Sequence, residues 1–179
     1  MLNRDLIYKK FNGCCFYTGK PLGSDWQIDH IQPKCDTLLY MPIPSGFKGM
    51  SEKEKKKLIS EYANRDENLV PSLRKVNHYK RHLSLEKFRA YIAGLQSRID
   101  KLPKWVDDYE KPTIVGIDYP VGYFSDVKYA NLGSEFWRER RKYLRYKKAI
   151  YIKEIAMLFG ITKSTPFSGK FYFEQEQKK

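Results

Sequence analysis

The sequence predicts an α+β fold, in which a small mixed core carries a helical insertion and a C-terminal extension made of a helix and a strand. Two observations predict it. Short β-prone runs bounded by glycine, proline and aspartate lie between segments in which apolar residues recur at helical spacing. A proline- and glycine-rich stretch then precedes a long basic helix. We therefore expect a core over residues 1–100, a connector over 101–133 and an accessory region over 134–179.

The first segment, residues 1–35, predicts a short helix followed by a hairpin. Ile7 and Phe11 recur at helical spacing. The β-prone run 15–18 is followed by a loop rich in glycine, proline and aspartate, and a second β-prone run begins at residues 26–28. The order of these signals indicates that the two runs pair with each other.

Residues 36–67 have the character of an insertion, because they begin with an irregular stretch that is rich in proline. Ser51 and Glu54 have the spacing of a capping box, which predicts a helix that continues to about Tyr62. This helix carries four lysines, which fit either a solvated face or a DNA contact: Lys53, Lys55, Lys56 and Lys57.

Two further helices complete the expected core. One begins near Ser72 and carries Asn77. The other begins near Ser84, which can serve as the N-cap, although Lys87 stands where a capping box needs an acid or glutamine. The apolar stripe of this second helix is typical of a core-facing surface.

The accessory region is expected to contain a long helix from Ser134 to about Leu158 and a short strand at residues 171–173. Basic residues on the helix alternate with aromatic and aliphatic ones. Four of the basic residues lie three or four positions apart, so they share one face, which we expect to contact phosphates: Arg138, Arg141, Arg145 and Lys148.

Net charge indicates the class of partner. The chain has 179 residues, and its 34 lysines and arginines exceed its 21 aspartates and glutamates, which gives a formal charge of +13. Such a surplus favours a polyanionic partner, and double-stranded DNA is the expected one. The alternative is a basic protein that is only solvated or associated with ribosomes.

The sequence also limits the location and the redox chemistry of the protein. No apolar run approaches the roughly 20 residues that a membrane-spanning helix needs, and no apolar signal region follows the N-terminus, so we expect a cytoplasmic protein with no membrane partner. Its three cysteines do not suggest a disulfide framework. The sequence leaves a homodimer open.

Four polar residues, in order along the chain, carry the expected chemistry. Asp29 is a hard oxygen ligand, and adjacent His30 can act as a general base at neutral pH. Asn68 can brace the backbone beside His30, and Asn77 offers an amide oxygen as a second ligand. Mg²⁺ or Mn²⁺ prefers such ligands and retains several waters, so two protein ligands suffice for hydrolysis of a phosphodiester.

These residues resemble the HNH endonucleases, which have the ββα-metal fold. The resemblance covers roughly residues 11–95 and is carried by four segments: Tyr17-Thr18-Gly19, Ile28-Asp29-His30-Ile31-Gln32-Pro33, Glu67-Asn68-Leu69-Val70 and Asn77-His78-Tyr79-Lys80. It implies a metal-dependent DNA endonuclease in which His30 activates water, Asn68 orients the histidine loop, and Asp29 and Asn77 bind the metal. It also implies that two strands hold the first motif and that a helix carries the last.

The chain departs from the family pattern in three respects. More residues separate His30 from Asn68 along the sequence than in compact members of the family. In addition, the adjacent His78 is an alternative to Asn77 as a metal ligand. The two Cys-x-x-Cys pairs of many members are absent, so we expect no structural zinc and interpret the cysteines as buried free thiols: Cys14, Cys15 and Cys35.

Lys80 and Arg81, directly after Asn77, are candidates to hold the scissile phosphate, or else they form a solvated helix end. Sequence specificity has no visible source in the core. Two other functions stay open, which are a catalytically inactive module that binds nucleic acid and an RNase or toxin on the same fold.

Overall fold

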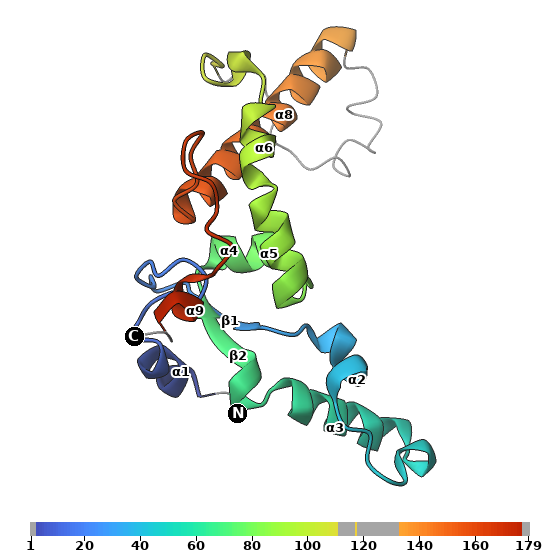
Figure 1. Ribbon diagram of the computed structural model, residues 1–179. Coiled ribbons are helices and arrows are strands. Elements are labelled where there is room, and N and C mark those ends of the chain that lie inside the picture. The colour runs from blue at the N-terminus through green and yellow to red at the C-terminus, as the bar shows by residue number, and fades with distance from the viewer. Residues whose placement is uncertain (1–2, 111–116, 118–132, 177–179) are drawn as a thin grey trace.

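The computed structural model describes residues 3–110, 117 and 133–176. This part of the chain is an α+β arrangement, mostly helical, with one two-stranded antiparallel sheet (Figure 1). The helices and strands follow in this order: α1 Arg4–Lys10, β1 Gln27–His30, α2 Thr37–Tyr40, α3 Glu52–Ala63, β2 Leu69–Ser72, α4 Arg74–Lys80, α5 Leu85–Ala93, α6 Leu95–Asp100, α8 Ser134–Leu158 and α9 Tyr172–Glu176.

Side-chain caps set the start of two helices where the sequence predicts them. At α3, Ser51 Oγ accepts from the backbone N–H of Glu54, and the Glu54 carboxylate accepts from the backbone N–H of Ser51, which is a complete capping box. At α5, Ser84 Oγ accepts from the backbone N–H of Lys87 without a reciprocal bond. The helix that begins after Ser84 ends at Gly94, where α6 begins, so its predicted apolar stripe is divided between α5 and α6.

The predicted hairpin between residues 15–18 and 26–28 is wrong. β1 pairs instead with β2, across the insertion, with Asp29 opposite Val70 and His30 opposite Leu69. The 15–18 run stays at the margin of this sheet, where the backbone N–H of Phe16 donates to the carbonyl of Pro71 at 2.9 Å. β2 is buried along its whole length, and this burial favours β2 over residues 15–18 as the partner of β1.

The predicted terminal strand at residues 171–173 is also wrong, because α9 begins at Tyr172. The Glu174 carboxylate accepts from the backbone N–H of Phe171 at 2.7 Å and pairs with Arg89 of α5 at 2.6 Å. One helical turn brings Glu174 back to both partners, while the Phe171 side chain is fully buried. These contacts explain why a β-prone aromatic run folds as a helix.

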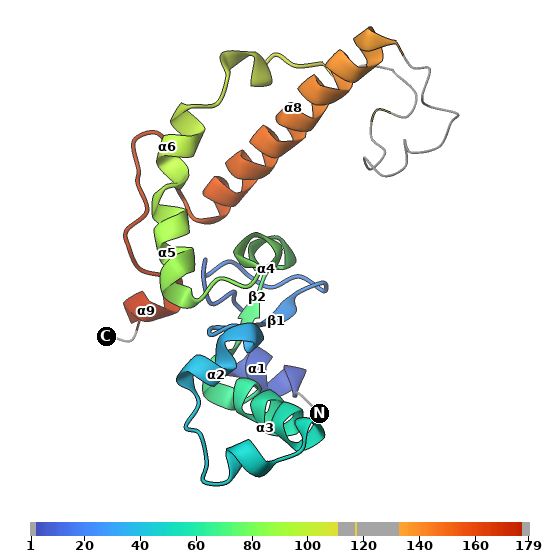
Figure 2. The ribbon, with the colours of Figure 1, turned by 90° about the vertical axis from the view of Figure 1, so that its right-hand side faces the viewer.

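The core joins segments that are far apart in the sequence. Val76 of α4, Phe88 of α5, Ile155 of α8 and Phe171 belong to one buried cluster. From this cluster α8 extends away, so that its N-terminal end lies far from the two strands in both views (Figures 1 and 2). The β-prone piece 113–115 of the predicted connector lies outside the described residues. Among the helices that the structure describes, none is long and apolar enough to cross a membrane.

Candidate active site

The site is built where α4 crosses one face of β1. Gln27 and Asp29 point to the same face of the strand, because side chains alternate along it. Asn77 and Lys80 are one helical turn apart on α4 and meet them in the same order. Asn77 Nδ2 donates to Gln27 Oε1 at 2.7 Å, and Lys80 Nζ lies 3.1 Å from Asp29 Oδ2.

Asp29 is a buried carboxylate with a full set of partners. Tyr17 Oη donates to Oδ2 at 2.5 Å, and the backbone N–H of His30 donates to Oδ1 at 2.8 Å. The ammonium of Lys80 approaches both oxygens, at 3.1 Å and 3.4 Å. Asp29 is 5% exposed and Lys80 is fully buried, so the desolvation of each charge is offset by the other. Burial, and next the nearby Asp29 charge, raise the pKa of Tyr17 well above its ordinary value.

The backbone of His30 is fixed on both sides. Its N–H donates to Asp29, and its carbonyl accepts from Lys80 Nζ at 2.7 Å. The next residue, Ile31, donates its N–H to the carbonyl of Asn68 at 3.0 Å. Asp29 and Lys80 therefore hold the histidine as well as each other.

The His30 imidazole bonds to Asn64, the C-cap residue of α3. Nε2 lies 2.9 Å from Asn64 Oδ1, while Asn64 Nδ2 donates to Ser60 Oγ at 3.3 Å. A carboxamide oxygen only accepts, so Nε2 carries the proton and Nδ1 keeps its lone pair. Burial lowers the pKa of His30, with the Asn64 bond acting in the opposite direction. The lowered pKa favours the neutral imidazole, which is the form that a general base needs.

Asn68 fastens the loop after His30. Its Oδ1 accepts from the backbone N–H of Gln32 at 2.8 Å, and its Nδ2 donates to the carbonyl of Gln32 at 3.1 Å. The same Nδ2 also donates to the carbonyl of Ala63 at 2.8 Å, at the end of α3. Asn68 is 5% exposed, and it ties the His30 loop and the insertion to the start of β2.

A pocket of about 300 Å³ opens beside Asp29 and His30. Its wall also includes the basic residues Lys34, Arg81 and His82. Asn77 does not line this pocket, because it faces a neighbouring groove of about 1230 Å³. The structure thus brings Asp29, His30 and Arg81 together at this pocket, whereas Asn77 lines the neighbouring groove.

Asp29 and Asn77 do not fit a divalent ion in this arrangement. Both Asp29 oxygens are engaged, and the Lys80 ammonium already balances their charge. Asn77 retains an amide oxygen, but its amide nitrogen is committed to Gln27. The donors have the oxygen chemistry that Mg²⁺ prefers, yet an ion at Asp29 would have to replace Lys80.

Arg81 stands out because of its backbone. It follows α4 with φ 54° and ψ −128°, a conformation that favours glycine. A non-glycine residue held there costs on the order of 1–3 kcal/mol. The strained position puts Arg81 in the wall of both the small pocket and the groove.

The predicted basic face of α8 is exposed. Of its four members, Lys148 lines the groove, and the other three continue along the helix away from the core: Arg138, Arg141 and Arg145. Arg138 lies 3.5 Å from Glu135 and 3.6 Å from Glu139.

The three cysteines are free thiols, but they are not all buried as predicted. Cys15 is buried, Cys14 is partly exposed and Cys35 is exposed. In the described part of the chain, no three histidine, cysteine, aspartate or glutamate side chains gather into a possible metal site.

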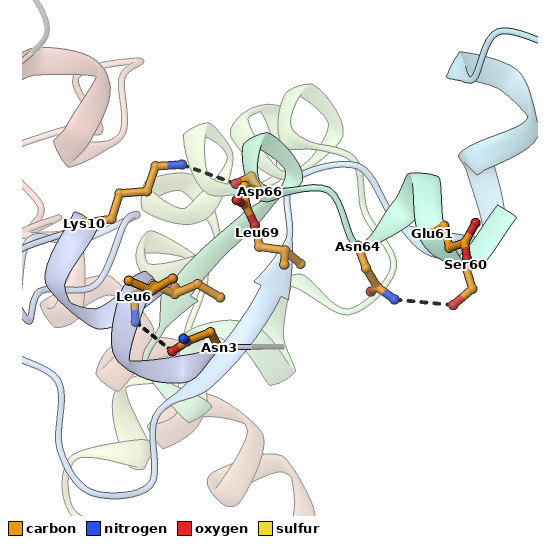
Figure 3. Close-up of a pocket in the computed structure, with 9 residues that line it drawn as sticks. Asn3, Leu6, Lys10, Ser60, Glu61, Asn64, Asp66 and Leu69 are labelled. Carbon is orange, nitrogen blue, oxygen red and sulfur yellow. Dashed lines mark hydrogen bonds between the residues drawn. The ribbon is translucent and has the colours of Figure 1, made fainter. Parts of the chain in front are cut away.

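A third pocket, of about 730 Å³, lies between α1 and the end of α3 (Figure 3). Asn64 lines it, and so do Lys10, Glu61 and Asp66. Lys10 Nζ donates to the carbonyl of Asp66 at 3.2 Å. Its mixed charge does not favour a phosphate.

Sequence reasoning missed two residues of the candidate site and misjudged a third. Asn64 gave no signal, because it lies in the insertion and meets His30 only after folding. Tyr17 lies in a recognisable motif, Tyr17-Thr18-Gly19, but no role was inferred for it. Lys80 was expected to contact phosphate, whereas it is fully buried against Asp29.

Comparison with models of protein families, with curated proteins and with solved structures finds no match to this chain.

Proposed function

We propose that this protein is a DNA endonuclease of the HNH type, which hydrolyses phosphodiester bonds with His30 as the general base. The observation that carries the proposal is an oriented histidine in a pocket lined by cationic side chains. His30 Nε2 is held by Asn64 at 2.9 Å, and the pocket beside it includes Lys34 and Arg81. The β1–β2–α4 arrangement, with Asn68 bracing the loop, supports the same assignment.

The reaction follows from the residues at the pocket. His30 Nδ1 takes a proton from a water molecule as the water oxygen bonds to phosphorus. The bond from phosphorus to the leaving oxygen breaks, and the leaving oxygen keeps the bonding electron pair and takes a proton from solvent. A positioned general base contributes about 10²–10⁴-fold to such a step. The Arg81 guanidinium, in the same pocket wall, balances charge that develops on the phosphate oxygens.

The resemblance to HNH endonucleases implies Mg²⁺ or Mn²⁺ with Asp29 and Asn77 as ligands. Such an ion would have to displace Lys80 from Asp29, and no step of the reaction is derived from it. Lys80 holds Asp29 in the present arrangement, so the ion and the lysine compete for one carboxylate. This pair also favours a second candidate function, a nucleic-acid-binding module without nuclease activity, because Asp29 is neutralised by Lys80 alone.

The experiment that separates these functions is incubation of the protein with plasmid, linear DNA and RNA, each with Mg²⁺, Mn²⁺ or a chelator. The proposal predicts cleavage of DNA that the chelator abolishes. Cleavage of RNA alone would support an RNase, and binding without cleavage would support the inactive module.

A calorimetric Mn²⁺ titration tests the ligands without relying on activity. Asp29→Ala and Asn77→Ala should weaken binding of the ion, and His78→Ala is the control that should not. Lys80→Met should bind Mn²⁺ more tightly than the unaltered protein and should gain more thermal stability from it, because the ion then replaces a missing buried charge. If only His78→Ala loses the ion, the ligand assignment is wrong.

A further inference from the structure

The groove beside the small pocket has the size and composition of a site for a polymer. Its volume of about 1230 Å³ exceeds the roughly 300–1,000 Å³ of most small-molecule pockets. It lies between α4, the α5–α6 segment and α8, and its described lining includes no aspartate or glutamate. Arg81, Arg98 and Lys148 give this wall three positive charges.

Tyrosines form the other part of the wall. The ring of Tyr79 lies 5.2 Å from that of Tyr91 and 5.6 Å from that of Tyr151. Tyr91 is 42% exposed, so part of its ring is open to the groove. Arg98 packs its guanidinium 3.9 Å from the Tyr91 ring centre and donates to backbone carbonyls of the same helical segment, which fixes both side chains.

The groove leads into the candidate active site. Arg81 and His82 line both the groove and the pocket that holds His30. A chain of phosphates that passes Arg98 and Arg81 would therefore arrive beside the general base. Arg81, the residue with the backbone φ of 54°, lies at this junction.

We infer that the groove binds an unpaired strand of nucleic acid next to the scissile phosphate. Cationic side chains beside an exposed aromatic ring, here Tyr91, are the combination that binds single strands, since phosphates meet the charges and a base stacks on the ring. Paired bases in a duplex are not free to stack on Tyr91. The inference deepens the proposed function, because it says which form of the substrate reaches His30.

Binding is measured by fluorescence anisotropy with a labelled single strand and with the matching duplex. The full chain carries His30→Ala, so that cleavage does not interfere and a failure of the nuclease proposal does not affect the result. Tyr91→Leu should weaken binding of the single strand by about 5- to 150-fold, with little effect on the duplex. Lys148→Gln should flatten the dependence of log K on log salt for the single strand by about 0.7.

Two matched controls keep the test specific. Tyr40→Leu removes an aromatic ring of similar exposure, 44%, and Lys9→Gln removes an exposed charge of α1. Neither residue lines the groove, so both variants should leave binding unchanged. Equal losses on single strand and duplex, or an equal loss with Tyr40→Leu, would overturn the inference. If Tyr91→Leu does not fold, an unchanged salt slope for folded Lys148→Gln overturns it instead.

Discussion

Four neighbours of His30 fix its backbone, the loop that follows it and the tautomer of its ring. Asp29 and Lys80 hold its backbone, and Asn68 holds the loop that follows. Asn64 sets the tautomer of the ring. Because Lys80 also neutralises Asp29, the same ion pair that orients the histidine also limits access of a metal ion to the carboxylate.

Asn64→Ala tests the orientation of the ring. Without an acceptor for Nε2–H, we expect both tautomers of His30 to be populated and cleavage to fall by about 10- to 100-fold, while DNA binding is retained. ¹⁵N NMR reports the tautomer and single-turnover kinetics report the rate. Ser60→Ala is the control, since it removes only the 3.3 Å contact behind Asn64. An unchanged tautomer and rate in Asn64→Ala would show that the contact has no role.

The strained backbone at Arg81 predicts different stabilities for two substitutions that both remove its side chain. Arg81→Gly relieves the strain at φ 54°, whereas Arg81→Ala retains it, so the glycine variant should be the more stable by about 1 kcal/mol. At an ordinary helical position alanine would be the more stable of the two. Chemical denaturation measures the difference. Both variants should bind nucleic acid equally weakly, and normal binding by either would remove Arg81 from the interface.

At the scale of elements, α9 is attached to α5 by Arg89 and Glu174, which are 2.6 Å apart. The hydrogen bond from Arg89 lowers the pKa of Glu174. A lowered folded-state pKa gives stability that is present above the unfolded value, about 4.3, and is lost as the pH falls through the folded value.

Glu174→Gln should therefore be less stable than the unaltered protein at neutral pH, and the gap should close in acid. Thermal melts at several pH values measure this gap. Glu52→Gln is a suitable control, because Glu52 belongs to an exposed pair within one helix. A gap that stays constant down to low pH would show that the ion pair does not dock α9.

The elements that the sequence predicted are those with local signals. Ser51 and Ser84 cap their helices within a few residues, so the start of α3 and of α5 could be read directly. Strand pairing is not local: the sequence predicted residues 15–18 as the partner of β1, whereas the structure pairs β1 with β2. The choice of β2 depends on burial in the folded core, which no short pattern records.

The candidate site also consists of residues that the sequence predicted and residues that it did not. The motif order predicted that Asp29, His30 and Asn68 lie together, and the structure places them within one hydrogen-bonded network. Asn64 and the burial of Lys80 could not be read from the sequence, because both depend on how the insertion and α4 fold back onto β1.

At the scale of the whole molecule, part of the positive charge follows α8 to the groove. The exposed arginines of α8 lead along one helix face to Lys148 at the groove, and the groove leads to Arg81 and His30. The N-terminal half of α8 lies far from the two strands (Figure 2), so under the proposed function it would contact duplex at a distance from His30.

Arg141→Gln together with Arg145→Gln tests this distal contact. Each lost phosphate contact should flatten the slope of log K against log salt for duplex DNA by about 0.9, similarly for all sequences. Glutamine retains helix propensity and part of the side-chain packing, so circular dichroism should show an unchanged fold. An unchanged slope in the folded variant would show that this face is only solvated.

The most direct test of the central claim is a comparison of cleavage and binding in His30→Ala. A general base acts on the chemical step, so the variant should bind DNA within about twofold of the unaltered protein and cleave it about 10²–10⁴-fold more slowly in a single turnover. Near-normal cleavage by His30→Ala would contradict the account, because His30 is the general base in the proposed reaction.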